Sequence, residues 1–163
     1  MCESIIIKSI VPRSLSKIEA SICLRLISSG GAVNVASVEG RLGASTKLVV
    51  AFAGTRLIGV GAIKNVHPQH ARSVAQSSGI DFPDGTRELG NVAVDVNCEA
   101  RGVGSGIVAC LVNSWTGPLY ATTFNPKMLH ILPKFGFVVS GRCWESEIQP
   151  GAKVQLLLRG VGT

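Results

Sequence analysis

The chain has 163 residues, of which 46% are hydrophobic, so it can bury a sizeable core and is not intrinsically disordered. Its net charge of +6 comes from dispersed basic residues, which suits an anionic ligand such as a nucleic acid, an acidic protein or a phosphorylated cofactor. Five cysteines without a CxxC pair argue against a disulfide framework or a zinc cluster, and no apolar run approaches the roughly twenty residues that span a bilayer. We therefore expect a cytoplasmic protein with reduced thiols and no membrane insertion.

The N-terminal part of the sequence predicts a strand followed by an amphipathic helix. Residues 4–11, SIIIKSIV, form a β-rich run that Pro12 ends. The next stretch, SLSKIEASICLRLISSGG, has helical periodicity, Ser16 and Glu19 have the spacing of a capping box, and the glycines at 30–31 end the helix. The face predicted to be apolar carries Leu15, Ile18, Ile22 and Leu26.

The middle of the sequence predicts a hairpin, a long connection and a further strand. Residues 32–46 are rich in glycine and serine and indicate a loop, with or without a short helix. Two β-rich runs at 48–53 and 56–63 flank a Gly-Thr turn. A long polar connection with a helix at 69–77 leads to the strand RELGNVAVDV, residues 87–96.

The last part predicts two helices that alternate with strands. A glycine-rich stretch, EARGVGSGIVACL, opens a helix that reaches about Trp115, and the strand PLYATTF follows. The segment NPKMLHILPKFG predicts a helix that ends at Gly136. The runs FVVSGRCW and VQLLLR are expected to pair antiparallel. Together the elements predict a single mixed α/β domain over residues 1–163.

The closely spaced glycines at 102, 104 and 106 need a physical reason, because glycine weakens both helices and strands. A P-loop requires a lysine after its last glycine, and none follows Gly106. A dinucleotide motif would fit Gly104, Gly106 and Ala109, but five residues separate the glycines from the preceding strand, and no acid closes the next strand. The pattern [Q/R]-x-x-G-x-[G/A] at a helix start fits Arg101, Gly104 and Gly106, and its free N–H groups would bind a pyrophosphate. A glycine-rich turn without a ligand is the alternative.

Two segments in the second half of the chain resemble the GNAT superfamily of acyl-CoA N-acyltransferases. ELGNVAVDVNCEARGVGSGIVACLV is similar to the family's central strand, loop and helix. YATTFNPKMLHILPKFGFVVSGRCW is similar to the block that follows, which ends in [K/R]-x-G-F, here Lys134 to Phe137. The hairpin also resembles the family's second and third strands, so the resemblance covers about residues 46–160. It implies a GNAT-like α/β fold (an α+β mixed sheet): a central, mostly antiparallel sheet, flanked by helices, whose fourth and fifth strands splay apart.

The resemblance also implies where acetyl-CoA binds as the acyl donor. In the family, the coenzyme lies in the V-shaped cleft between the splayed strands, with its pantetheine running like an added strand. In this chain the end of the fourth strand would then pair with the pantetheine and thioester, amides of the glycine stretch would hold the pyrophosphate, and an asparagine would line the other wall. The implied cofactor-binding residues are Val94, Asp95, Val96, Arg101, Gly102, Val103, Gly104, Ser105, Gly106 and Asn125.

Acyl transfer to an amine needs a neutral amine, a hydrogen-bond donor to the oxyanion, and a proton for the departing thiolate if it is not simply released. Glu88 is the catalytic candidate, because many relatives place at this strand position a carboxylate that deprotonates the amine through water. The alternative is a structural acid that orients the loop or pairs with Arg87. Leu132 stands where many relatives have a tyrosine that acts as the general acid. The thiolate therefore leaves without a proton donor, or another group such as Cys143 or His130 donates the proton.

Three further polar residues have less specific interpretations. His67 and His70 form an HxxH pair in the long connection, but zinc would need two more ligands, so no metal is expected. Both histidines are interpreted as solvated loop residues, with contact to the acceptor substrate as the alternative. Tyr120, the only tyrosine, lies on a predicted strand and is expected in the core or the cleft wall.

These observations favour an N-acetyltransferase that transfers an acetyl group from acetyl-CoA directly to a primary amine. The acceptor is a small molecule, a protein or a nucleobase, and its site is expected within residues 12–45 and 65–87. One alternative is a non-catalytic CoA-binding module of the same fold, which Leu132 favours and the intact motif from Arg101 to Gly106 opposes. Another is a nucleic-acid-directed acyltransferase or binding protein, which the basic charge favours. The family also suggests a homodimer.

Overall fold

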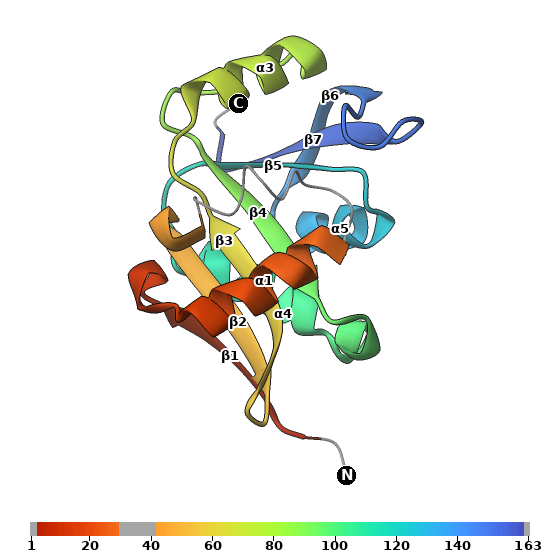
Figure 1. Ribbon diagram of the computed structural model, residues 1–163. Helices are drawn as coiled ribbons and strands as arrows, with labels where there is room; N and C mark the ends of the chain where they lie inside the picture. The colour runs from red at the N-terminus through yellow and green to blue at the C-terminus, as the bar shows by residue number, and fades with distance from the viewer. Residues whose placement is uncertain (1–2, 30–41, 162–163) are drawn as a thin grey trace.

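The computed structural model describes residues 3–29 and 42–161, and the strands in these ranges form one seven-stranded sheet of order β1-β2-β3-β4-β5-β7-β6 (Figure 1). The strands are β1 (Ile5–Ile10), β2 (Lys47–Ala53), β3 (Arg56–Ile63), β4 (Arg87–Val94), β5 (Leu119–Thr123), β6 (Val138–Glu145) and β7 (Lys153–Arg159). Neighbouring strands pair antiparallel, except for the parallel pair β4 and β5. The mixed, mostly antiparallel sheet predicted from the sequence is thus confirmed.

Helices cover both faces of this sheet. The helices are α1 (Lys17–Ser29), α3 (Pro68–Ser78), α4 (Val103–Asn113) and α5 (Pro126–Ile131), with the 3-10 turns η1 (Pro12–Ser14), η2 (Leu42–Ala44), η3 (Val96–Arg101) and η4 (Leu132–Phe135). In Figure 1, α1 crosses in front of the sheet and α4 lies behind it. Two separate hydrophobic clusters agree with this view, because one contains the buried side chains of α4 and the other contains those of α1.

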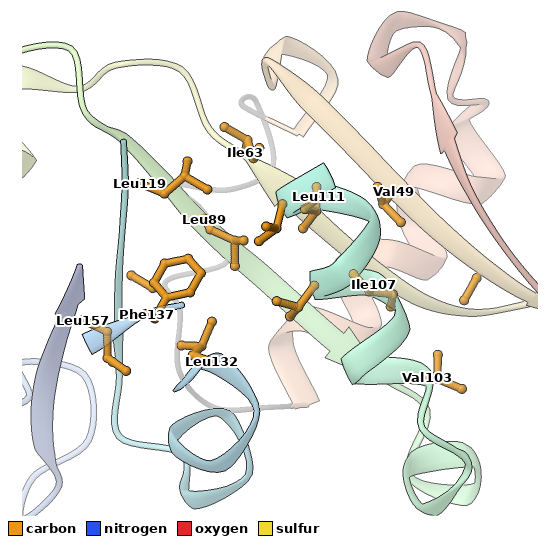
Figure 2. Packing of buried hydrophobic residues seen from close by; sticks show 14 of the residues in the cluster. Val49, Ile63, Leu89, Val103, Ile107, Leu111, Leu119, Leu132, Phe137 and Leu157 are labelled. Atoms are coloured by element: carbon orange, nitrogen blue, oxygen red, sulfur yellow. The ribbon is translucent and has the colours of Figure 1, made fainter. Parts of the chain in front are cut away.

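The larger cluster lies between α4 and the sheet (Figure 2). Ile107 and Leu111 of α4 are fully buried there against Ile63 and Leu89 of the sheet. A glycine in β3 makes this close approach feasible, because a Cβ on Gly61 would collide with the Ile107 side chain. Burial of this apolar area is the main favourable contribution to folding on this side of the sheet.

The structure confirms the start of the predicted first helix and corrects its buried face at one position. Ser16 and Glu19 exchange two backbone–side-chain hydrogen bonds of 3.1 Å each, which is a complete capping box. Ile18, predicted on the apolar face, is 75% exposed, whereas Cys23 and Ile27 are buried against the sheet. The other three predicted residues, Leu15, Ile22 and Leu26, are partly buried and pack against the same cluster as Cys23 and Ile27, so the predicted face is correct except at Ile18. The predicted stop at Gly30 and most of the predicted loop lie outside the described residues.

The parallel strands β4 and β5 pair only at their beginnings. Their register consists of the pairs of Arg87 with Leu119 and of Glu88 with Tyr120. A few residues further on, the register between β4 and β3 is interrupted, and Asn91 has a φ of 55°, which marks a bulge. The two strands then part, as the resemblance implies.

β4 ends at Val94, two residues before the predicted end at Val96. The reason is a local turn, because the Asp95 side chain accepts a hydrogen bond of 2.9 Å from the Asn97 amide and caps η3. The other predicted strands and helices are present with boundaries close to those expected, including α3 in the long connection and the antiparallel pair of β6 and β7.

Candidate functional site

A cleft of about 620 Å³ opens where β4 and β5 part, and this volume is typical of small-molecule sites. The C-terminal half of β4 forms one wall, and Asn125 with α5 forms the other. α1 borders the cleft from one face of the sheet, and the first turn of α4 borders it from the other face. The lining residues are Ile22, Arg25, Leu26, Ser29, Arg56, Leu57, Val92, Ala93, Val94, Asp95, Val96, Asn97, Glu99, Gly102, Gly104, Ser105, Asn125, Lys127, Met128 and Ile131.

The first turn of α4 presents backbone amides at one end of this cleft. The helix begins at Val103, directly after Gly102, whose φ of 75° requires the conformational freedom of glycine. The Gly106 amide donates to the Gly102 carbonyl over 3.0 Å, so the amides of Val103, Gly104 and Ser105 have no acceptor within the helix. Gly102, Gly104 and Ser105 line the cleft. This end of the cleft therefore favours an anion.

Gly104 keeps the cleft open between its two walls. A Cβ at this position would lie 3.4 Å from Ile131 Cδ1 on α5 and 3.9 Å from Val94 Cγ2 on β4. A longer side chain would project into the space between these walls. At Gly104 the missing side chain therefore leaves space in the cleft, whereas at Gly102 it permits the backbone conformation.

Three other residues of the glycine stretch do not line the cleft. The Val103 side chain is buried in the core, and a Cβ on Gly106 would collide with Ile7, so Gly106 lets α4 pack closely on β1. The Arg101 guanidinium donates a hydrogen bond of 2.8 Å to the Glu3 carbonyl. Sequence reasoning grouped these residues with the anion-binding amides because a motif does not show which glycine serves packing.

The predicted residues at the end of β4 and at Asn125 do line the cleft. Beyond Glu88, β4 pairs with β3 alone among the described strands, so the edge of Val94 that faces β5 is available to an extended ligand. Val96 lies in η3, outside the strand, with a side chain that is 75% exposed. On the opposite wall, the Asn125 Oδ1 atom accepts a hydrogen bond of 2.9 Å from the Lys127 amide and caps α5.

Five charged side chains line the cleft. Asp95 and Arg56 form an ion pair of 3.7 Å on the β4 side. Glu99 of η3 and Lys127 of α5 form a second ion pair, which connects the two walls. Arg25 of α1 is the fifth charge, and among the described residues it has no carboxylate partner. The lining therefore carries a net positive charge, which suits a ligand with phosphates.

Glu88 lies outside the cleft lining, in a buried cluster. Its side chain is 9% exposed, with Oε1 at 2.9 Å from Lys64 Nζ and Oε2 at 3.4 Å from His70 Nε2. Burial alone would raise the pKa of Glu88, but the Lys64 ammonium and the His70 contact outweigh burial and lower the pKa to about 2. Arg87, the partner expected if Glu88 were structural, donates instead to the Thr46 hydroxyl over 2.9 Å.

The candidate proton donors, and Leu132 at the position of the family's tyrosine, do not line the cleft. Leu132 is 1% exposed and lies in the core beside Phe137 (Figure 2). Tyr120 is buried with its ring centroid 4.8 Å from that of Phe82, and burial, with Glu88 nearby, raises the pKa of Tyr120 far above its usual value. His130 and Cys143 do not line the cleft either.

The two histidines of the HxxH pair have separate roles. His67 is the N-cap of α3, and its Nδ1 accepts a hydrogen bond of 3.1 Å from the His70 amide. His70 instead contacts Glu88, a tertiary pairing that the sequence does not reveal. Within residues 3–29 and 42–161, no group of three or more histidine, cysteine or acidic side chains could hold a metal ion. In the same part of the chain, every helix is too short or too polar to cross a membrane.

Comparison with solved structures shows that this fold is similar to that of GNAT-family acyltransferases. The acetyltransferase of the GNAT family from Streptococcus pneumoniae matches with a TM-score of 0.66 and 15% identity, over 98% of this chain and 100% of that one. FeeM, an N-acyl amino acid synthase from uncultured soil microbes, matches with a TM-score of 0.69 and 16% identity, over 98% of this chain and 92% of that one. An acyl-CoA N-acyltransferase from Pseudomonas aeruginosa matches with a TM-score of 0.68 and 14% identity, over 96% of this chain and 99% of that one.

These comparisons confirm the predicted GNAT fold over nearly the whole chain. No family model matches the sequence, and no curated protein matches it either. At such low identity the likeness establishes the fold, and the function must be argued from the site.

Proposed function

We propose that this protein is an N-acyltransferase that transfers an acetyl group from acetyl-CoA directly to a primary amine. One observation carries the proposal: the cleft between the parted strands connects three free backbone amides at one end with an unpaired strand edge. The amides of Val103, Gly104 and Ser105 suit a diphosphate, because partly charged N–H groups converge there. The edge of β4 suits the extended pantetheine, whose amide groups can add to it as a strand does.

The charges of the cleft support a coenzyme with several phosphates. Lys127 projects from the wall opposite the amides and is 63% exposed, so it can contact a phosphate after leaving Glu99. Arg25 adds positive charge from α1. Of the predicted cofactor-binding residues, seven line the cleft: Val94, Asp95, Val96, Gly102, Gly104, Ser105 and Asn125.

The reaction is a direct transfer between two bound substrates. The amine nitrogen attacks the thioester carbonyl carbon, the C–N bond forms, and the C–S bond breaks with its electron pair going to sulfur. The amine loses one proton, and the CoA thiolate takes one from solvent, since none of the candidate acids lines the cleft. A free backbone amide of β4 would stabilise the oxyanion that forms on the carbonyl.

A non-catalytic coenzyme-binding module is the second candidate, and one observation favours it. The position that carries a tyrosine in many GNAT relatives holds Leu132, which is fully buried and contributes only packing. Such a protein would bind acetyl-CoA without releasing its thiol.

Calorimetry and a thiol-release assay test both candidates. We expect acetyl-CoA to bind the wild-type protein, and at least one member of a panel of primary amines to trigger release of CoA thiol. Gly104→Leu should weaken binding at least tenfold, because its side chain would project between Ile131 and Val94. Asn113→Leu, at the exposed far end of the same helix, is the matched control and should bind normally.

The outcomes separate the candidates. Undiminished binding by Gly104→Leu, or no binding by the wild type, would contradict coenzyme binding in this cleft. Binding without thiol release across the amine panel would favour the non-catalytic module. Longer acyl-CoA donors in the same assay would show whether acetyl is the preferred group.

A further inference from the structure

A cluster of polar side chains stands at the point where β4 and β5 separate, on the face of the sheet that α3 covers. Glu88 belongs to the last row in which the two strands pair, next to Tyr120 of β5. His70 comes from the first half of α3, and Lys64 follows β3. The Glu88 carboxylate contacts both His70 and Lys64, so the cluster is organised around a buried anion.

This face is opposite to the one that carries the free amides of α4. Side chains alternate along β5, so Leu119 and Ala121 belong to the cluster under α4 while Tyr120 belongs to the cluster with α3. Glu88 pairs with Tyr120 and therefore shares its face, as the contact with His70 on α3 confirms. A coenzyme held by the α4 amides would present its thioester to the opening between the strands, and an amine arriving from the α3 side would pass this cluster.

We propose that His70 accepts the proton of the acceptor amine, directly or through one water, and that Glu88 is a positioning residue that orients the His70 ring. The proposal rests on the proposed function and deepens it by assigning the base. It also changes the role expected for Glu88 from base to support for the base.

The chemistry of the two side chains favours this division of roles. A carboxylate that is buried beside an ammonium holds its charge firmly and is a poor acceptor for the proton of an amine. An imidazole titrates near neutral pH, which is the range in which a general base works best. The His70 side chain is 44% exposed, so it can reach a substrate, whereas the Glu88 side chain is 9% exposed.

The geometry also leaves the correct ring nitrogen available. If Nε2 carries the proton, it donates to Glu88 Oε2 over 3.4 Å, and Nδ1 keeps its lone pair. In the described part of the chain, Nδ1 of His70 has no hydrogen-bond partner. Glu88 would thus fix the tautomer that a base requires, as carboxylates do in other histidine-dependent sites.

Protons and electrons balance in this scheme. As the amine nitrogen bonds to the carbonyl carbon, its proton moves to Nδ1 of His70, and the imidazolium that forms is stabilised by the Glu88 charge. The C–S electron pair leaves on sulfur, the thiolate takes a proton from solvent, and the imidazolium returns its proton to solvent. No oxidant or further reactant is needed.

The groups around His70 determine the pH profile that we expect. Glu88 of β4 faces its Nε2 side, Lys64 faces the same carboxylate, and Tyr120 of β5 lies with its ring centroid 6.4 Å away. On its own helix, the His67 ring centroid is 6.2 Å away. Arg142 of β6 binds carbonyls at the other end of α3. The rate should rise with pH, because only the neutral ring of His70 can accept the proton of the amine.

The test compares kcat, KM and coenzyme affinity in variants of the full chain with an amine that the wild type accepts. His70→Gln should lower kcat by about 10²–10⁴-fold and remove the rise of kcat with pH, while the Kd for acetyl-CoA stays within twofold. Glu88→Gln should lower kcat less, because the ring keeps its lone pair but loses its orientation, and should move the rise of kcat to lower pH, because the imidazolium loses the neighbouring negative charge. Ser73→Ala, at an exposed position of the same helix that does not contact Glu88, is the matched control and should change nothing.

A rescue experiment distinguishes the loss of a catalytic base from a folding defect. In His70→Ala, added imidazole should restore part of the lost kcat, which a merely structural role would not produce. Wild-type kcat and an unchanged pH profile in His70→Gln would overturn the assignment while leaving the proposed function intact. Failure of imidazole rescue in a folded, coenzyme-binding His70→Ala would likewise count against it. If the wild type binds no acetyl-CoA, the proposed function itself fails.

Discussion

The two halves of β4, residues 87–90 and 91–94, have different neighbours and different roles. In the first half, Glu88 and Leu89 are buried, and the strand has neighbours on both sides. In the second half, Ala93 and Val94 pair with β3 alone among the described strands, and together with Val92 they line the cleft. The bulge at Asn91 separates the halves. The difference teaches that the neighbours of a strand, rather than its own alternation of apolar residues, decide whether it serves the core or the site.

The largest expected effect is a difference in the free energy of unfolding between variants in the two halves of β4. Leu89→Ala removes a side chain that is 2% exposed in the main core and should lower the free energy of unfolding by about 2–5 kcal/mol. Val94→Ala, in the open half, should lower it by less than about 1.5 kcal/mol, because less apolar area leaves the core. Urea unfolding of both variants measures the difference. Equal losses would show that the open half is as tightly integrated as the closed half.

The second prediction concerns the charge in the closed half. Folding lowers the pKa of Glu88 from its usual 4.5 to about 2, so the folded state is stabilised above pH 4.5 and loses this stabilisation as the pH falls towards 2. The wild type should therefore lose up to about 3 kcal/mol over this range that Glu88→Gln does not lose.

Denaturant midpoints of the wild type and Glu88→Gln between pH 7 and pH 2.5 measure this difference, since the other carboxylates titrate in both proteins. The two curves should converge as the pH falls. Parallel curves would mean that folding leaves the pKa of Glu88 unchanged, so that Lys64 and His70 would not stabilise the buried carboxylate.

The fold was predictable where the signals are local. The capping box of Ser16 and Glu19, the hairpin around Gly54 and the helix ended by Gly136 each depend on a few neighbouring residues, and each is present in the structure. The parting of β4 and β5 followed from the resemblance, since it depends on the tertiary arrangement of several strands.

The site was predictable only in part, because its charges pair across long stretches of sequence. Nothing local connects Glu88 with Lys64 and His70, and the expected partner Arg87 lies next to it in sequence but bonds to Thr46, just before β2. The same limit applies to Gly106, whose packing against Ile7 requires knowledge of where β1 lies.

The smallest expected effect concerns the ion pair across the cleft, next to the open half of β4. Glu99 and Lys127 form an exposed ion pair across the cleft, and such pairs contribute less than about 1 kcal/mol to stability. Lys127→Gln should therefore leave the urea midpoint nearly unchanged, yet weaken acetyl-CoA binding several-fold, because it removes a charge that can contact a phosphate.

Glu99→Gln is the matched variant, since it removes the competing carboxylate and should strengthen binding at low salt. Both changes in affinity should fade in 0.5 M salt, where the Debye length is only about 4 Å. Calorimetry at two ionic strengths measures them. If both variants instead unfold at clearly lower urea concentrations with unchanged affinity, the pair clamps the walls of the cleft together. The open half of β4 would then be held from both sides, as the closed half is, and the contrast between them would fail.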